Sequence, residues 1–225
     1  MISLRLKKIC DLVDNNSVVA DIGTDHGIIP VYLSKEKVSK KIIATDISKN
    51  SLEKLNKKLL FDKTLNNIET RVSDGLDSFK EFEIDTIIIS GMGGVLIRDI
   101  LLSNLNIAKS ANYLILSPNN SLDILRKFLL ENSFTIENES DVFENNKYYQ
   151  ILKVKVGKEL YKYDYEYIYG KLLIKNKSEN LKLFLKNELK KYNLILDKID
   201  KNTSEQSYLK IEDKICVIRS ILNEF

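Results

Sequence analysis

The sequence has few of the residues that form covalent cross-links or metal sites, with two cysteines and one histidine among 225 residues. Cys10 and Cys216 lie at opposite ends of the chain, and each stands inside a helical apolar pattern, which is typical of a buried, reduced thiol. This arrangement does not favour a disulfide bond or a zinc site. We therefore expect a protein without a bound metal.

Long apolar runs are also missing. No run approaches the roughly 20 apolar residues that span a bilayer, and the first residues lack the apolar core and small-residue cleavage site of a signal peptide. We expect a cytoplasmic protein that does not depend on a membrane. Charge is nearly balanced, with 35 basic and 32 acidic residues and a net charge of +3. Because the charges are interspersed, this balance permits RNA binding without requiring it.

Apolar, β-branched runs alternate with amphipathic stretches through the first two thirds of the chain. The composition, 44% hydrophobic, can bury one core of about 150 residues and a modest appendage. The alternation predicts a parallel sheet with right-handed crossovers. Ser48 and Ser121 are candidate helix N-caps. The expected strands cover residues 17–23, 41–47, 68–74, 85–94 and 113–119, and the expected helices cover 28–36, 48–62, 93–105 and 121–132.

Two further expected strands, residues 134–143 and 147–156, are separated only by the polar turn 144–146. Because so short a link cannot join parallel strands, we expect an antiparallel hairpin at the edge of the sheet. Alternating strands and helices that end in a hairpin are the layout of Rossmann-like class I methyltransferases. Nicotinamide-binding domains usually continue with parallel units instead.

Beyond Tyr161 the pattern is helical. Apolar residues follow one stripe of residues 180–199, and they recur at spacings of three and four in 208–222. This spacing is that of a coiled-coil seam, and the short link 201–206 predicts antiparallel neighbours. The seam would consist of Leu181, Leu185, Leu189, Tyr192, Leu196 and Ile199 against Tyr208, Ile211, Ile215, Ile218 and Leu222.

The chain should therefore form two domains, an α/β domain over residues 1–160 and a helical domain over 161–225. Two interpretations of the helical hairpin remain open: it packs only on itself, or it also binds substrate. Lysines on its outer face would suit phosphates. They are Lys182, Lys186, Lys190 and Lys191.

The loop after the first expected strand, residues 21–27, has the features of a ligand-binding loop. Gly23 and Gly27 let the backbone turn sharply and approach a ligand, and the following helix offers free amides. Unlike a dinucleotide fingerprint, the loop has an acid, Asp25, at its middle glycine position. An anion would repel a pyrophosphate, whereas the sulfonium of S-adenosylmethionine is a cation. The loop, with Asp21 at its start, therefore favours S-adenosylmethionine over NAD.

Other candidate cofactor residues follow the next strands. Asp46, beside Ile47, can accept both ribose hydroxyls, although it could instead cap the next helix. Asp74 and Gly75 stand where related enzymes hold an adenine edge, although Asp-Gly is also an ordinary turn. Three glycines within residues 91–94 indicate a close approach by a ligand, and we assign Gly91 and Met92 to the cofactor. Asn119, after the fifth strand, could present its amide to a base, although Pro-Asn is also a common turn.

Taken together, these residues resemble the bacterial tRNA (adenine-N1)-methyltransferases that modify adenine 22. The resemblance runs from Arg5-Leu6 through ADIGTDHGIIPVYL, VSDGL, GMGG with LIRDIL, SPNNSLDILRKFL and NNKYYQILKV into the helical hairpin. It implies that Asp25 is the essential carboxylate, that the first domain binds S-adenosylmethionine, and that the helical domain helps to bind tRNA. We expect a monomer whose substrate contacts come from Arg5, His26, Gly93 and Asn119.

Three positions differ from residues common in that family, which has alanine for Gly27, glutamate for Asp46 and glutamine for Ser117. The first two changes preserve the chemistry, but Ser117 would shorten a possible base contact. Adenine N1 carries no proton when neutral, so the reaction needs no strong base, and His26 is expected to contact the loop or the substrate. Asp25 would accept a hydrogen bond from the exocyclic amine and stabilise developing positive charge. A loop-capping role for Asp25 is the alternative.

Three other functions make different predictions. A methyltransferase for a small molecule or a protein would show no affinity for tRNA. An RNA-binding adaptor with an inactive methyltransferase domain would bind RNA without turnover. An NAD-dependent oxidoreductase is disfavoured by Asp25 and by the β-hairpin.

Overall fold

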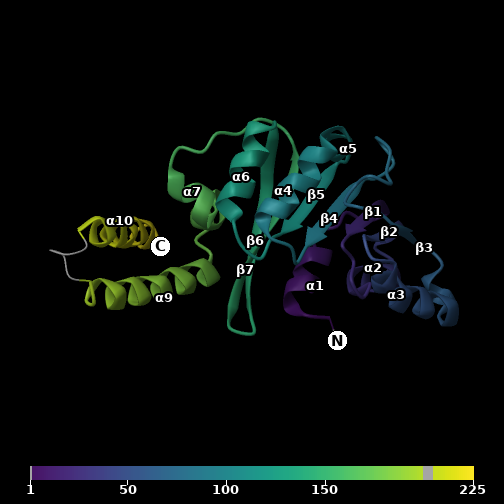
Figure 1. The fold of residues 1–225 in the computed structure, drawn as a ribbon, viewed down its shortest axis with the longest axis horizontal. Helices are drawn as coiled ribbons and strands as arrows, with labels where there is room; N and C mark the ends of the chain where they lie inside the picture. Colours follow the sequence, from purple (N-terminus) through teal and green to yellow (C-terminus); the bar gives the residue numbers. More distant parts are fainter. Residues whose placement is uncertain (1, 200–204) are drawn as a thin grey trace. The chain divides into compact units, whose positions relative to one another are not determined.

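A computed structural model describes residues 2–199 and 205–225. The described chain forms two compact units, Met1–Leu160 and Tyr161–Phe225. The first unit is a seven-stranded sheet with the order β3-β2-β1-β4-β5-β7-β6, flanked by helices (Figure 1). Its strands are β1 (Ser17–Ile22), β2 (Ser39–Asp46), β3 (Ile68–Val72), β4 (Thr86–Ser90), β5 (Tyr113–Ser117), β6 (Phe134–Glu144) and β7 (Lys147–Val156).

The sheet confirms the predicted Rossmann-like methyltransferase architecture. Strands β1 to β5 are parallel to one another, and β7 is antiparallel to both β5 and β6. The central strands are buried on both faces, which is why they read as continuous apolar runs. The carboxyl ends of the parallel strands lie at one edge, where ligands bind in open α/β sheets.

Seven helices of the first unit connect and cover these strands in the described chain: α1 (Leu4–Cys10), α2 (Ile28–Lys35), α3 (Lys49–Phe61), the 3₁₀ helix η1 (Lys63–Leu65), α4 (Gly94–Ser103), α5 (Leu105–Ser110) and α6 (Leu122–Glu131). Side chains of α1 and α2, including Ile9 and Leu33, pack on one face of the sheet against Val19, Ile42 and Ile88. Helices α4 and α6 pack against each other and lie in front of the strands in Figure 1.

Several boundaries differ from the predictions for local reasons. The helix expected over residues 93–105 ends at Ser103, because the backbone of Asn104 leaves helical geometry. The side-chain amide of Asn104 donates to Asp77 Oδ1 at 2.7 Å. Ser48 and Ser121 do occupy N-cap positions, but neither hydroxyl makes a capping hydrogen bond. The hairpin turn is two residues rather than three, since Glu144 stays in β6. Both turn residues, Asn145 and Asn146, have positive φ, as a tight hairpin turn requires.

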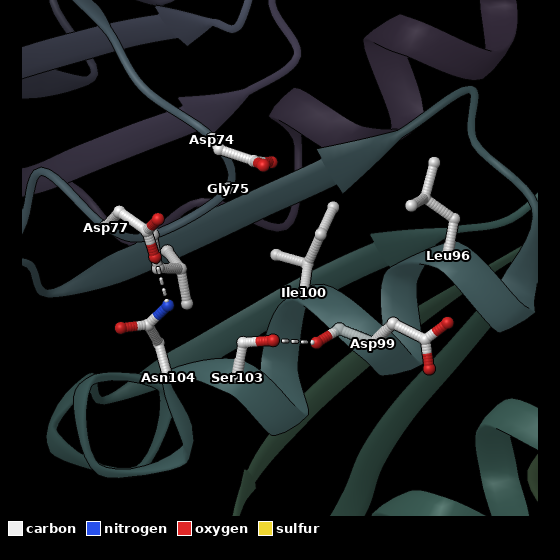
Figure 2. Close-up of a pocket in the computed structure, with 9 residues that line it drawn as sticks. Asp74, Gly75, Asp77, Leu96, Asp99, Ile100, Ser103 and Asn104 are labelled. Atoms are coloured by element: carbon white, nitrogen blue, oxygen red, sulfur yellow. Dashed lines mark hydrogen bonds between the residues drawn. The ribbon is translucent and has the colours of Figure 1, made fainter.

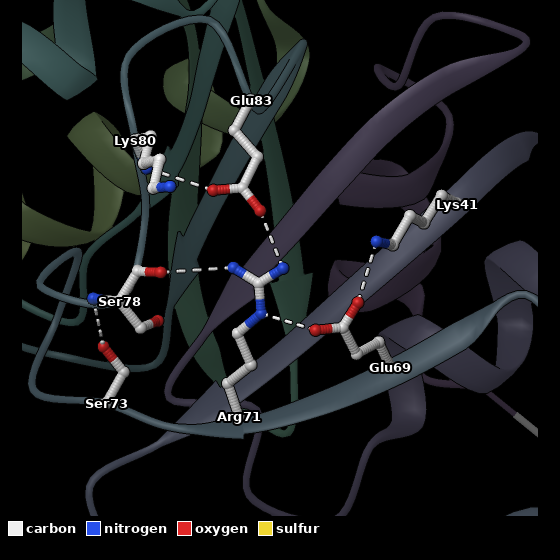
Figure 3. Close-up of polar contacts among 7 residues, drawn as sticks. All are labelled: Lys41, Glu69, Arg71, Ser73, Ser78, Lys80 and Glu83. Atoms are coloured by element: carbon white, nitrogen blue, oxygen red, sulfur yellow. Dashed lines mark hydrogen bonds and ion pairs between the residues drawn. The ribbon is translucent and has the colours of Figure 1, made fainter.

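An ion-pair network fixes the segment between β3 and β4 (Figure 3). The Arg71 guanidinium donates to Glu69 at 2.6 Å, to Glu83 at 2.7 Å and to the carbonyl of Ser78 at 3.2 Å. Lys41 adds a second cation to Glu69 at 2.8 Å. These hydrogen bonds lower the pKa of Glu69 to about 2. The network holds the loop that carries Asp74 and Gly75 against the edge of the sheet.

A buried network attaches the β-hairpin to α6. Arg126 and Glu139 are fully buried and form an ion pair at 2.7 Å, and Arg126 also donates to the side-chain oxygen of Gln150. A buried charge of this kind is tolerated only when it is paired and hydrogen-bonded. The network therefore holds β7 at one register, including Tyr149 and Gln150, which lie beside the end of β5.

The second unit contains α7 (Asp164–Tyr169), α8 (Lys171–Lys175), α9 (Glu179–Leu196) and α10 (Glu205–Leu222). Helices α9 and α10 pack side by side, as predicted (Figure 1). The short helices α7 and α8 were not predicted. The packed residues are only partly those expected, because Ile221 rather than Leu222 is buried at the end of α10. Most of the predicted link 201–206 lies outside the described residues.

The two cysteines have different environments. Cys10 is buried, as predicted, and burial raises the pKa of its thiol to about 12. The prediction for Cys216 is wrong, since this residue is exposed on α10 between the buried positions Ile215 and Ile218. Both thiols are free. Within the described residues, no helix has the length and apolarity needed to cross a membrane, and no cluster of three potential metal ligands occurs.

Candidate active site

A cavity of about 290 Å³ opens at the carboxyl ends of β1 and β4. Six of the predicted site residues line it: Asp21 comes from the end of β1, and the other five come from the loops after β1 and β4. The lining residues are Leu6, Asp21, Gly23, Thr24, Asp25, His26, Ile28, Ile29, Ser90, Gly91 and Met92. The structure thus brings together two glycine-containing loops that are about 70 residues apart in the sequence, as expected at a carboxyl edge.

Asp21 is the buried carboxyl of this cavity. It is only 3% exposed and accepts one hydrogen bond, at 2.6 Å, from the Thr24 hydroxyl. Burial raises the pKa of Asp21 to about 6, and the Thr24 hydrogen bond only partly opposes that increase. A carboxylate with so few partners is poised to interact with a cationic ligand, which would replace the hydration that it lost on burial.

Asp25 and His26 lie at the rim. The Asp25 side chain is 73% exposed and lies 3.4 Å from His26 Nδ1, whose side chain is 45% exposed. Asp25 has φ of 49°, in the left-handed region that aspartate tolerates better than most residues. None of the hydrogen bonds found among the described residues uses the Asp25 carboxylate as a loop cap. The geometry leaves the carboxylate accessible to a substrate.

Asp46 is the last residue of β2 and Ile47 follows it, and neither residue lines this cavity. Asp46 Oδ1 accepts a hydrogen bond from the backbone amide of Ser48 at 2.8 Å. This bond shapes the turn into α3, although Ser48 and not Asp46 occupies the N-cap position. Ile47 is 69% exposed, so its side chain is free to cover a ligand.

Asp74 and Gly75 line a neighbouring cavity of about 260 Å³ between the loop after β3 and α4 (Figure 2). Asp74 also begins a turn, because its carbonyl accepts from the amide of Asp77 at 3.1 Å. The Asp74-Gly75 pair can therefore form a turn and also line a site for an adenine edge. Leu96 and Ile100 of α4 supply the apolar side of this cavity, opposite the carboxylates of Asp74 and Asp77.

Packing requires glycine at two of the positions expected to approach a ligand. A Cβ on Gly27 would lie 2.6 Å from Leu55 of α3, so this residue allows the loop after β1 to sit on α3. A Cβ on Gly94 would lie 2.4 Å from the carbonyl oxygen of Ser121. In contrast, Gly91 has φ of 83° and no atom near its missing side chain, and Gly23 faces the Met92 side chain. Of the glycines at 91, 93 and 94, only Gly91 borders open space.

Replacing Gly94 by alanine should therefore destabilise the fold. The new methyl group would overlap backbone atoms of the loop 119–121, which cannot move as a side chain can. We expect a loss of about 1–3 kcal/mol in the free energy of unfolding, measured by denaturant titration. Gly93→Ala is the matched control, because the nearest atom, 3.0 Å away, is the side-chain oxygen of Asn120. Equal stabilities of the two variants would contradict this role for Gly94.

Arg5 supports the loop after β4 through residues at the end of β5 and just beyond it. Its guanidinium donates to the Ser117 hydroxyl at 3.0 Å, the Ser117 carbonyl at 2.6 Å and Asn119 Oδ1 at 3.0 Å, and it stacks on Tyr149 at 4.3 Å. The side-chain amide of Asn119 in turn donates to the carbonyl of Gly91, and its backbone amide donates to the carbonyl of Met92 at 2.8 Å. Arg5 and Asn119 thus position the loop after β4.

This network corrects the interpretation of Ser117. The residue is fully buried, and its hydroxyl donates to the carbonyl of Gln150 at 3.2 Å. It supports β7 and Arg5 and does not face the cavity, so it is not a base contact. Tyr149 was missed by sequence reasoning, because only the hairpin pairing brings it beside Arg5. Gly93 is the N-cap of α4 and is not among the residues that line the cavity.

Comparisons with known proteins agree with this architecture. Residues 2–152 match the family described as a methyltransferase domain. The chain is 30% identical over 163 residues to the tRNA (adenine(22)-N(1))-methyltransferase of Bacillus subtilis strain 168, an alignment that covers 72% of this chain and 68% of that protein.

Two solved structures match over almost the whole chain. Sp1610 of Streptococcus pneumoniae has a TM-score of 0.93 and 30% identity, covering 99% of this chain and 100% of that one, and it has also been solved with S-adenosyl-L-methionine. TrmK of M. capricolum with S-adenosyl-homocysteine has a TM-score of 0.84 and 30% identity, covering 100% and 99%. The chain described here belongs to the family of bacterial tRNA (adenine(22)-N(1))-methyltransferases.

Proposed function

We propose that the protein transfers a methyl group from S-adenosylmethionine to N1 of adenine 22 in tRNA. The observation that carries the proposal is the pairing of two carboxylates in one cavity, the buried Asp21 and the exposed Asp25. The first suits a cationic cofactor without phosphates, and the second remains available to a base.

The cavity fits S-adenosylmethionine by its chemistry. Asp21 lies at the bottom of the cavity with one hydrogen-bond partner, and Gly23 and Gly91 give backbone surfaces without side chains of their own. When bound, the cofactor supplies the methyl group, and the electron pair of its broken carbon–sulfur bond stays on sulfur. Asp46 and Ile47 would hold the ribose side, and Asp74 and Gly75 would hold the adenine edge. Gly27, whose missing side chain leaves room for Leu55, would present its backbone to the cofactor.

The chain's own residues have a limited task, because adenine N1 offers its lone pair without losing a proton. The base must leave its stack and enter the cavity, where positioning of the reactants can lower the barrier by ~7–11 kcal/mol. Asp25 accepts a hydrogen bond from the exocyclic amine, which orients N1 and stabilises the positive charge that develops on the ring. His26, beside Asp25, contacts the substrate and need not act as a base. Arg5 and Asn119 position Gly91 and Met92 through the hydrogen bonds described above.

One assay separates this function from its rivals. Purified protein is incubated with labelled S-adenosylmethionine and an unmodified tRNA transcript, and the modified nucleoside is mapped. We expect 1-methyladenosine at position 22 and no incorporation into a matched transcript with guanine at that position. Binding of tRNA without methylation would indicate an adaptor, and incorporation only into small molecules or proteins would indicate another substrate class. We further propose a cytoplasmic monomer, and light scattering would test the monomeric state.

The helical hairpin is proposed to bind tRNA through Lys182, Lys186 and Lys190. Replacing all three by glutamine should raise the Kd for tRNA and reduce its salt dependence. Fewer phosphates are then neutralised by lysine, so binding releases fewer counterions. The effect of Lys182 should be the smallest, since it already lies 3.8 Å from Glu179. Filter binding at several salt concentrations measures both quantities. An unchanged Kd and slope would leave the hairpin as a purely structural element.

A further inference from the structure

One strongly basic segment of the chain lies in the α/β unit. Residues 35–63 contain nine lysines and four acidic residues, a net charge of +5, whereas the whole chain carries +3. The remaining residues together therefore carry −2. This segment contains β2 and α3, so the α/β unit has a basic segment of its own besides residues 171–191 of the helical unit, which contain seven lysines and two acidic residues.

Helix α3 separates its apolar and basic residues. Leu52 and Leu55 are buried, whereas Lys54, Lys57 and Lys58 are exposed. Residues three and four positions apart lie on the same side of a helix, so these lysines form one face, which we call the α3 lysine face. No ion pair found among the residues that the structure describes involves any of the three. By contrast, Lys182 and Lys191 of α9 each have a carboxylate neighbour.

The α3 lysine face is attached directly to the loop that carries Asp25. Lys58 Nζ donates to the carbonyl of His26 at 3.4 Å, and Leu55, one turn earlier, occupies the space that Gly27 leaves open. The basic face therefore begins at the residue next to Asp25 and continues outward over Lys54 and Lys57.

The mouth of the site presents an electrostatic difficulty for RNA. Asp21 and Asp25 line the cavity, and Asp74, Asp77 and Asp99 line the neighbouring one. These carboxylates repel a polyanion, and an adjacent cluster of unpaired cations compensates for that repulsion most effectively within about 10 Å, the Debye length at moderate salt.

We propose that the α3 lysine face binds backbone phosphates of the tRNA strand that carries the target adenine. The proposal rests on the proposed function, since it takes tRNA as the substrate. Lysines act on phosphates as point charges and read no sequence. The face therefore contributes affinity and holds the strand in register with the cavity, while the cavity selects the base.

The test compares two triple variants with the same change in charge. The first replaces Lys54, Lys57 and Lys58 by glutamine. The control replaces Lys80, Lys109 and Lys158, which lie at the opposite edge of the same sheet, where the parallel strands begin. Filter binding to unmodified tRNA over a range of salt concentrations, steady-state methylation kinetics and calorimetry with S-adenosyl-homocysteine are measured for each.

For the α3 variant we expect a Kd for tRNA raised roughly 10- to 30-fold at low salt and a salt slope shallower by about 2, as three lost phosphate contacts imply. KM for tRNA should rise, with kcat at saturating tRNA and the affinity for S-adenosyl-homocysteine within about twofold of wild type. Arginine at the same three positions should restore binding, because it keeps the charge.

Equal losses in the α3 and control variants would overturn the proposal, because only overall charge would then matter. An unchanged Kd and slope in the α3 variant would overturn it as well, and in both cases the methyltransferase function would stand. If the wild-type protein binds and methylates no tRNA, the proposed function fails together with this surface.

Discussion

Replacing Asp25 by asparagine should slow tRNA methylation at least about 100-fold while cofactor binding is retained, a loss of roughly 2.7 kcal/mol in transition-state stabilisation. The amide keeps the size of the side chain but loses its negative charge, so it no longer stabilises the positive charge that develops on adenine. The carboxylate is 73% exposed at the rim of the cavity, so the change should not disturb the core. Single-turnover methylation at saturating tRNA and cofactor measures the effect on the chemical step.

The choice of asparagine follows from the backbone. With φ of 49°, position 25 is left-handed, and alanine there costs about 1–2 kcal/mol of strain that asparagine largely avoids. Loss of activity in Asp25→Ala would therefore mix strain with chemistry. Glycine accepts this φ freely, so Asp25→Gly is the second control and should be as inactive as Asp25→Asn. Near wild-type turnover in the Asn variant would show that charge at this position does not contribute to the reaction.

His26 provides an independent check on this mechanism. If no proton is removed from N1, replacing His26 by asparagine should cost less activity than Asp25→Asn. The His26 variant should also keep the shape of the wild-type pH dependence of kcat. A step in the wild-type profile that disappears in the His26 variant would indicate base catalysis and revise the role of His26.

The elements best predicted from sequence are those whose pattern is local. The buried strands β1, β2, β4 and β5 are short β-branched runs, and their alternation with helices fixes a parallel sheet. The hairpin β6–β7 follows from the shortness of its link. The stripes of α9 and α10 follow from helical spacing. None of these inferences requires knowledge of which residues meet in space.

The features that were missed or misread depend on contacts between distant segments. Gly94 looked like a ligand-approach glycine, but the atom that excludes a side chain there belongs to Ser121. Ser117 looked accessible because it follows a strand, but β7 and Arg5 enclose it. Cys216 lies in an apolar pattern, yet a helix in a two-helix packing buries only part of its circumference. Sequence periodicity does not reveal which flank remains exposed.

The same limit applies to the site. Sequence reasoning placed Asp21, Gly23, Asp25 and Gly91 at the edge of one sheet, because parallel strands end together. It did not show that the Asp21 carboxyl is buried and the Asp25 carboxylate exposed. That difference comes from the sheet itself, since Asp21 is the next to last residue of β1 and pairs with Ala44 and Ile88 on the two sides. Asp25 lies beyond the strand on the open turn.

Replacing Asp21 by asparagine should weaken S-adenosylmethionine binding about 10- to 100-fold and at the same time stabilise the unliganded fold. A charge-assisted interaction with the cationic cofactor contributes about 1.5–3 kcal/mol, which the neutral amide loses. In the unliganded protein, however, the ionised carboxylate is buried with only the Thr24 hydroxyl as its hydrogen-bond donor. The pKa of about 6 implies that ionisation costs the fold roughly 2–3 kcal/mol at neutral pH, at 1.36 kcal/mol per unit.

The stabilising effect of Asp21→Asn should depend on pH. The pKa of Asp21 is higher in the folded state, about 6, than in the unfolded state, near 4. As far as Asp21 is concerned, the folded protein is therefore most stable below pH 4, where this residue is protonated, and it loses this stability as the pH rises to about 6. Asp21→Asn should therefore match wild type in unfolding free energy near pH 4 and exceed it increasingly up to pH 6. Denaturant titrations across this range measure the difference, and a constant difference would contradict the assignment.

Cofactor affinity should change in the opposite direction. The ionised form of Asp21 attracts the cofactor, so binding returns its pKa toward the ordinary value near 4, and wild-type affinity should fall about tenfold between pH 7 and pH 5. The Asn variant should show no such fall. If both proteins lose affinity in parallel on acidification, another group controls the titration and Asp21 does not bind the cofactor's positive charge. The ionised Asp21 thus destabilises the unliganded fold, and binding of the cationic cofactor offsets that cost.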